Sequence, residues 1–284
     1  MREDVRTWRR IMLRIPGSDP EPLICALHAI GTLGTETRDD RLVAWFPDAP
    51  VVPDLHERLW AALGGNPAPL VISDESVADD RWHERWMEDL APFMLGRRFI
   101  VVPGEDRRVP DTAHRIPLRV TPGRAFGTGE HATTRLCFGL LEESVTPGAS
   151  VLDAGTGSGI LAIAASLLGA RPVVAVDVDP EAVFVARRNA LLSGAPGVQF
   201  AVTPVEALRT GPATRFDVVM GNLDALTLVG AMPRLGEFVA GCLIVSGLLE
   251  TDVEGVSRAA VARGLRPGSR ACREGWAALR FTRA

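Results

Sequence analysis

The residues with the clearest chemical potential are three glycines that follow a hydrophobic strand pattern. In VLDAGTGSGILAIAA, residues 151–165, Gly155, Gly157 and Gly159 stand between an apolar strand and an apolar helix. Glycine is needed where the backbone turns sharply or where a ligand approaches main-chain atoms closely. Ligands of doubly wound sheets bind at the carboxyl ends of the strands. The segment therefore predicts a ligand-binding turn, although a tight strand-to-helix turn can need glycine for its geometry alone.

An acidic residue at the end of the next strand pattern sharpens this prediction. Asp177 closes the segment VVAVD and lies 22 residues after Gly155. A carboxylate there can accept hydrogen bonds from both ribose hydroxyls of an adenosine-containing ligand. Asp179 and Pro180 follow at once, and we interpret Asp179 as the N-cap of the next helix rather than as a ligand contact.

The glycine spacing separates two cofactor classes. Dinucleotide enzymes carry G-x-G-x-x-G, in which the helix N-terminus faces a pyrophosphate. Here the spacing is G-x-G-x-G, and Asp153 precedes it at the strand end. An anion at that position disfavours a pyrophosphate and suits the ammonium of an amino-acid moiety. The pattern predicts S-adenosylmethionine, which carries adenosine, an ammonium and a sulfonium but no phosphate, and it disfavours a nicotinamide cofactor.

Two polar residues follow later strands. Asn222 ends FDVVMGN, where a side chain can touch the transferring methyl group or the incoming amine. We predict that Asn222 is catalytic and contacts the cofactor; the alternative is a helix N-cap. The continuation Leu223-Asp224 lacks the Pro-Pro-aromatic sequence of many amino-methylating enzymes. Glu206 either accepts a hydrogen bond from adenine or is simply solvated.

A second glycine-rich segment precedes the first strand of this region. TPGRAFGTGEHATTRLCF, residues 121–138, leads into a helix that carries Thr133 and Thr134. Such a segment can fold over a cofactor as a lid and exclude water. His131 invites assignment as a general base, but a single histidine at a loop-to-helix junction favours a structural hydrogen bond.

The elements around these residues predict two domains. Near the N-terminus the order is β-α-β-β-α-β, typical of a small ferredoxin-like α+β domain. The strands are expected at 8–15, 33–37, 42–46 and 70–72, and the helices at 20–30 and 55–63. Two further strands are expected at 99–102 and 116–120. From residue 150 strands alternate with helices, which predicts an α/β, doubly wound, mostly parallel sheet. The strands there are expected at 151–153, 173–177, 198–202, 216–221 and 242–246, with helices at 158–169, 180–193, 224–235 and 250–263 and an antiparallel hairpin at 265–282.

Composition sets broader limits. The chain has 284 residues, enough for two domains, and 46% of them are hydrophobic. A net charge of -4 gives no general attraction to a phosphate backbone, so no direct nucleic-acid binding is expected. The four cysteines are scattered and no histidine stands at ligand spacing, so we expect reduced thiols and no metal. No apolar signal core or membrane-length stretch is present in the sequence, which favours a cytoplasmic enzyme without a membrane partner.

Several segments together resemble the PrmA family, the methyltransferases of the ribosomal stalk-base protein (large-subunit protein number eleven). They are DDRWHERWMEDLAPFMLGRRFIVVPG, PGRAFGTGEHATT, DAGTGSGILAIAA, AVDVDP and GNLDALTL. The first two are specific to that family, whereas the glycine turn belongs to the wider methyltransferase superfamily. Residues 1–73 match only in predicted topology.

The resemblance implies a class I S-adenosylmethionine methyltransferase that modifies lysine side-chain or N-terminal amines of its protein substrate. It implies a recognition domain at 1–73, a linker region at 74–96 and a catalytic domain at 97–284. Within the linker region, the spacing of four between Trp82, Trp86 and Leu90 independently predicts one helical face, which favours a packing role. The remaining alternatives are a related enzyme acting on another protein lysine or a small amine, and a non-catalytic binding protein. The predicted cofactor contacts are Phe126, Thr128, Thr134, Gly155, Gly157, Gly159, Asp177 and Asn222.

Overall fold

The computed structural model of the chain divides into two compact units, Met1–Trp82 and His83–Ala284. The structure describes residues 7–15, 20, 23–24, 26–27, 32, 34–38, 40–47, 71–78, 91–105, 107–112, 114–121, 127–208 and 214–283. The predicted helix at 55–63, the Trp82, Trp86 and Leu90 face, and Phe126 lie outside these residues.

The first unit contains a four-stranded antiparallel sheet in the order β2-β3-β1-β4. Its strands are β1 (Thr7–Arg14), β2 (Gly34–Arg38), β3 (Arg41–Pro47) and β4 (Val71–Ala78). This is the sheet expected of a ferredoxin-like domain. Ile11 and Leu13 are buried, alternate with less buried residues along β1, and pack with Leu23 and Leu27 of the predicted first helix. β4 is longer than the predicted strand at 70–72, because the polar residues that follow Ile72 also pair with β1.

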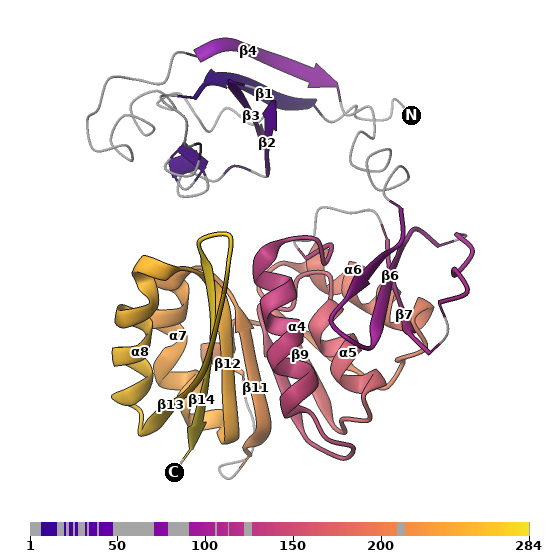
Figure 1. The fold of residues 1–284 in the computed structure, drawn as a ribbon, viewed down its shortest axis with the longest axis vertical. Helices are drawn as coiled ribbons and strands as arrows, with labels where there is room; N and C mark the ends of the chain where they lie inside the picture. Colours follow the sequence, from indigo (N-terminus) through magenta and orange to yellow (C-terminus); the bar gives the residue numbers. More distant parts are fainter. Residues whose placement is uncertain are drawn as a thin grey trace. The chain divides into compact units, whose positions relative to one another are not determined.

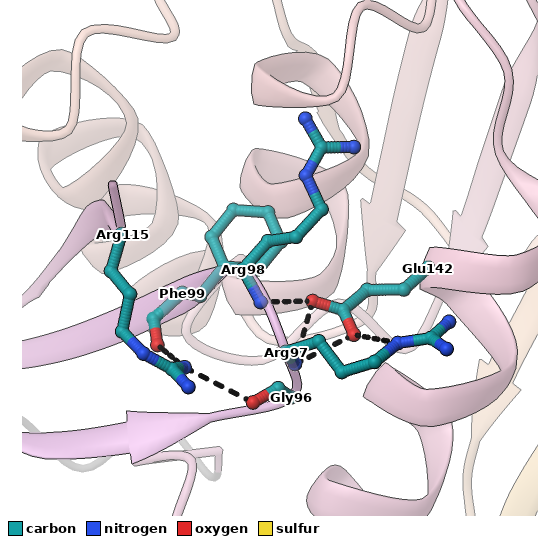
Figure 2. Close-up of polar contacts among 6 residues, drawn as sticks. All are labelled: Gly96, Arg97, Arg98, Phe99, Arg115 and Glu142. Atoms are coloured by element: carbon teal, nitrogen blue, oxygen red, sulfur yellow. Dashed lines mark hydrogen bonds and ion pairs between the residues drawn. The ribbon is translucent and has the colours of Figure 1, made fainter. Parts of the chain in front are cut away.

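A small three-stranded sheet opens the second unit, in the order β5-β6-β7. β6 (Phe99–Pro103) and β7 (Ile116–Val120) match the predicted strands, whereas β5 (Phe93–Leu95), only three residues long, gave no periodic signal. Figure 2 shows the hydrogen bonds between the turn before β6 and Glu142 of helix α4 (Ala132–Ser144). The buried carboxylate of Glu142 accepts hydrogen bonds from the backbone amides of Arg97 at 2.8 Å and Arg98 at 2.8 Å.

The main sheet has seven strands in the order β10-β9-β8-β11-β12-β14-β13. The first five are parallel and β13–β14 is an antiparallel hairpin, as predicted. Figure 1 shows β11, β12 and the β13–β14 hairpin of this sheet side by side. The strands are β8 (Val151–Ala154), β9 (Val173–Asp177), β10 (Gln199–Val202), β11 (Phe216–Asn222), β12 (Val239–Leu249), β13 (Leu265–Arg273) and β14 (Trp276–Arg283). The chain order runs outward from β8 in one direction and from β11 in the other, so the topological switch point lies between these two strands.

Helices cover both faces of this sheet. They are α5 (Ile160–Leu167), α6 (Pro180–Leu192), α7 (Ala225–Phe238) and α8 (Val253–Val261), with short 3-10 helices η1 (Val205–Ala207) and η2 (Glu250–Asp252). Alternate strand residues enter two cores: Val151, Val218 and Ile244 pack with α4 and α5, while Leu152 and Val219 pack on the other face with α7 and α8. This alternation is the pattern of strands buried on both faces, and the predicted α/β doubly wound fold is confirmed.

No helix among the residues that the structure describes is long and apolar enough to cross a membrane.

Candidate functional site

Three of the predicted site residues lie at one edge of the sheet, directly after a single row of paired residues. Val176 of β9 pairs with Ala154 of β8, which in turn pairs with Gly221 of β11. Asp177, Gly155 and Asn222 are the next residues of these three strands. Parallel strands present their carboxyl ends at the same edge, so the three residues converge beside the switch point.

The glycine turn has the backbone that only glycine adopts without cost. The φ angles of Gly155, Gly157 and Gly159 are 73°, 53° and 81°. A Cβ on Gly155 would also collide with the side chain of Leu223, and one on Gly159 would lie 2.9 Å from the Cβ of Ala186 on α6. Gly159 thus permits close packing of α5 on α6, while Gly155 brings the turn against the chain that follows Asn222.

Asp177 accepts a hydrogen bond from the glycine turn and can accept further hydrogen bonds from a ligand. Its Oδ2 accepts a hydrogen bond from the Gly157 amide at 2.8 Å, and its Oδ1 accepts one from the Asp179 amide at 3.0 Å. Each carboxylate oxygen has two lone pairs, so both can accept a second donor such as a ribose hydroxyl. Asp179 itself caps α6 by accepting from the Glu181 amide at 2.8 Å, with Pro180 in the first turn, as predicted.

Asn222 does not cap a helix. The N-cap of α7 is Asp224, which accepts from the Thr227 amide at 2.9 Å, so the alternative interpretation of Asn222 is wrong. The Oδ1 of Asn222 is buried and has no hydrogen-bond partner among the described residues. The next residue, Leu223, is held in place by a hydrogen bond from its amide to the Ser246 carbonyl at 3.0 Å.

A second group of buried polar atoms lies on the face that α4 covers. Asp153 is 1% exposed; Thr156 donates to its Oδ2 at 2.7 Å, and its Oδ1 has no partner among the described residues. Burial raises the pKa of Asp153 to about 6, and the nearby charge of Asp177 adds to the rise. A buried carboxylate beside the charge of a second carboxylate makes this place favourable to a cation.

Thr134 belongs to the same face. It stands one turn before Cys137, whose thiol interacts with Ser246 and with the charge of Asp153, and whose pKa burial raises to about 12. The hydroxyl of Thr134 is buried and lacks a partner among the described residues. Thr134, Asp153 and Asn222 therefore each offer a buried polar atom that a ligand would satisfy.

These atoms fit S-adenosylmethionine. The free Asp153 oxygen matches an ammonium, Asp177 matches ribose hydroxyls, and the paired carboxylates match a positively charged molecule. Within the described part of the chain, no group of three or more His, Cys, Asp or Glu side chains could hold a metal ion.

The remaining predicted residues are placed less centrally. His131 is the N-cap of α4: its ring accepts from the Thr133 amide at 3.3 Å and lies edge-on to Trp276, which agrees with a structural role. Thr128 is half-buried, and Glu206 is exposed on η1.

Two polar residues near the turn were not anticipated from the sequence. Ser158 and Asn189 are both buried and hydrogen-bonded to the glycine turn or its surroundings. A signal for Asn189 did exist, because it follows Val185 and Ala186 on the apolar face of α6, where a polar side chain needs partners.

Comparison with known proteins agrees with this geometry. The family model described as "Ribosomal protein L11 methyltransferase (PrmA)" matches residues 35–284. A protein of Sorangium cellulosum named "Ribosomal protein L11 methyltransferase" is 36% identical over 259 residues, 85% of this chain and 79% of that protein. One of Symbiobacterium thermophilum with the same name is 40% identical over 207 residues, 72% of this chain and 66% of that protein, slightly less than two thirds of its length.

A solved structure is similar as well. The crystal structure of a ribosomal protein L11 methylase from Lactobacillus delbrueckii subsp. bulgaricus superposes with a TM-score of 0.62 at 30% identity. The similarity covers 68% of this chain and 98% of that one.

Proposed function

Because the chain belongs to the PrmA family of ribosomal protein L11 methyltransferases, we propose that it transfers methyl groups from S-adenosylmethionine to amines of ribosomal protein L11. The chemistry and the cofactor are those of the family: the chain is an S-adenosylmethionine-dependent protein methyltransferase. The observation that carries the site assignment is the convergence of Gly155, Asp177 and Asn222 after one row of paired residues.

We assign the cofactor to this edge. Asp177 would accept hydrogen bonds from the ribose hydroxyls, and Asp153 would face the ammonium of the amino-acid moiety. Gly155 and Gly157 let the ligand approach the main chain, while Gly159 serves packing. The buried hydroxyl of Thr134 would form a hydrogen bond with the same ligand. Phe126 and Thr128 stay predictions from the loop sequence.

When bound, S-adenosylmethionine supplies an electrophilic methyl group on a sulfonium. The acceptor must be a neutral amine, and a lysine side chain has an ordinary pKa of ~10.4, so it must lose a proton first. Desolvation in a closed, partly apolar site would lower the pKa of such an amine, because burial disfavours its charged form. No general base is needed, which agrees with the capping role of His131.

Asn222 would orient the acceptor. Its buried Oδ1 can accept a hydrogen bond from the amine and so align the nitrogen lone pair for in-line attack. The neighbouring Leu223 restrains Asn222, because its side chain packs against Gly155 and its amide donates a hydrogen bond to the Ser246 carbonyl. Correct alignment and exclusion of water then account for the catalytic work.

We further propose that the N-terminal unit recognises the substrate, with the domains at 1–73 and 97–284 joined by the region at 74–96. A small antiparallel sheet with its own core is consistent with an independent binding module. We propose a cytoplasmic location, because ribosomal proteins are assembled into ribosomes there.

The test is methylation of purified, unmethylated L11 with radiolabelled S-adenosylmethionine, followed by mass spectrometry of the labelled protein. We expect label on lysine or N-terminal amines of L11 and none on a matched set of other ribosomal proteins. Labelling of another protein or of a small amine instead of L11 would contradict the substrate and retain the chemistry.

A further inference from the structure

Asn189, on α6, uses every polar atom of its side chain although it is 0% exposed. Its Oδ1 accepts hydrogen bonds from the Thr121 amide at 2.9 Å and the Thr121 hydroxyl at 2.8 Å. Its Nδ2 donates to the Ser158 carbonyl at 2.9 Å. One carboxamide therefore joins the end of β7 to the glycine turn. Only a group that accepts on one side and donates on the other can make both links.

Ser158 makes a second link to the same region of the chain. Its hydroxyl donates to the Gly127 carbonyl at 2.6 Å, and the side chain is buried. Gly127 has a φ of +105°, and a Cβ there would lie 3.0 Å from the Ser158 hydroxyl. Thr121 and Gly127 are thus both tied to Ser158, one through Asn189 and one directly.

The network reaches the predicted ribose acceptor. Gly157, the residue before Ser158, donates its amide to Asp177 at 2.8 Å. A shift of Ser158 would therefore move the glycine whose amide fixes the Asp177 carboxylate. Buried hydrogen-bond networks of this kind hold their members in one arrangement, and removing one member leaves others unpaired.

From these contacts we infer that Asn189 is a positioning residue for cofactor binding: it fixes the glycine turn and the Asp177 carboxylate relative to Thr121 and Gly127. This rests on the assignment of the turn as the S-adenosylmethionine site. Asn189 does not touch the reacting atoms. Its role is to set the turn before the ligand arrives, so its loss weakens binding of the cofactor rather than the chemical step.

The same helix provides a matched control. Ser193, one turn after Asn189, accepts a hydrogen bond from the Arg119 amide of β7 at 2.9 Å. This bond also joins α6 to β7, and among the described residues neither Ser193 nor Arg119 hydrogen-bonds to the glycine turn. Ser193→Ala therefore removes a tether of the same kind without touching Ser158.

The experiment measures the Kd of S-adenosylhomocysteine by calorimetry for the full chain and for Asn189→Ala, Ser158→Ala, their double variant and Ser193→Ala. We expect Asn189→Ala and Ser158→Ala each to raise the Kd roughly tenfold, the double variant to add little, and Ser193→Ala to leave it within about twofold. Hydrogen exchange of the Thr121 amide should accelerate in Asn189→Ala. Thermal unfolding of each variant verifies that it is folded at the titration temperature. Ser158→Ala keeps the carbonyl that Asn189 contacts and removes the second bond of the network, from the Ser158 hydroxyl to Gly127, so it tests the network if Asn189→Ala does not fold.

An unchanged Kd in Asn189→Ala or Ser158→Ala, or an equal rise in Ser193→Ala, would overturn the inference. Losses that multiply in the double variant would contradict a single network. A parent chain that does not bind the ligand at all would instead refute the proposed cofactor site, which separates the two failures.

Discussion

Replacing Gly155 with alanine tests the contact between the glycine turn and Leu223. Gly155 has a φ of +73°, and an alanine Cβ would overlap the Leu223 side chain, with its Cγ only 3.1 Å away. A left-handed backbone costs an alanine about 1–2 kcal/mol. Overpacking a buried contact costs about 1–3 kcal/mol more, so we expect Gly155→Ala to lose roughly 2–5 kcal/mol of unfolding free energy.

A matched glycine separates the two contributions. Gly148 has a φ of +86° and open space around its Cβ position, so Gly148→Ala carries the backbone cost alone. Urea unfolding of both variants should show Gly155→Ala less stable by about 1–3 kcal/mol. Leu223→Ala in the Gly155→Ala background should restore part of this difference, because it removes the colliding group. Equal stability of Gly155→Ala and Gly148→Ala, or no recovery in the double variant, would refute the packing argument.

Three further predictions concern the polar residues of the site. Asn222→Ala should lower kcat more than it raises the cofactor Kd, because its buried oxygen is assigned to the acceptor amine; steady-state kinetics and calorimetry measure the two, and equal losses would leave Asn222 a plain binding contact. Burial raises the pKa of Asp153 from 3.8 to about 6. Between about pH 4 and pH 6 the folded chain therefore holds a proton that the unfolded chain has released, and this group's contribution to stability falls by about 3 kcal/mol as the pH rises. Asp153→Asn should flatten the pH dependence of urea unfolding of the ligand-free protein in that window, and an unchanged slope would contradict the buried carboxylate. Asp179→Ala should cost about 1 kcal/mol of stability through loss of the α6 cap, measured by urea unfolding, and a loss near zero would contradict the cap.

Much of the catalytic fold could be predicted because its signals are local. The strand at 173–177 was predicted residue for residue, since an apolar run ends at Asp177 and Asp179-Pro180 begins the next helix. The hairpin at the C-terminus follows from the polar turn Arg273-Glu274-Gly275, which joins its two strands. β5 was missed because three residues carry no period, and its pairing with β6 is a tertiary contact.

The site was predictable only in part for the same reason. Asp177 and Asn222 are the last residues of their strands and Gly155 directly follows its strand, and strand ends can be located from the sequence. The collision partner of Gly155 and the hydrogen bonds of Asn189 depend on which segments meet in space, so a polar residue on the apolar face of α6 was the only trace of the network. The sequence does not reveal that Asn222 has a free oxygen, because it does not determine whether Asn222 or Asp224 caps α7.

The central claim, that S-adenosylmethionine binds at the carboxyl edge of β8, β9 and β11, is tested most directly by calorimetric titration of the parent chain, Asp177→Ala and Asp179→Ala. The two aspartates are two residues apart, but Asp177 accepts a hydrogen bond from the glycine turn, whereas Asp179 accepts one in the cap of α6. We expect one cofactor per parent chain, a Kd raised by roughly tenfold or more in Asp177→Ala, and a Kd within about twofold of the parent in Asp179→Ala. A parent chain that does not bind, or equal affinities for the two variants, would contradict the site.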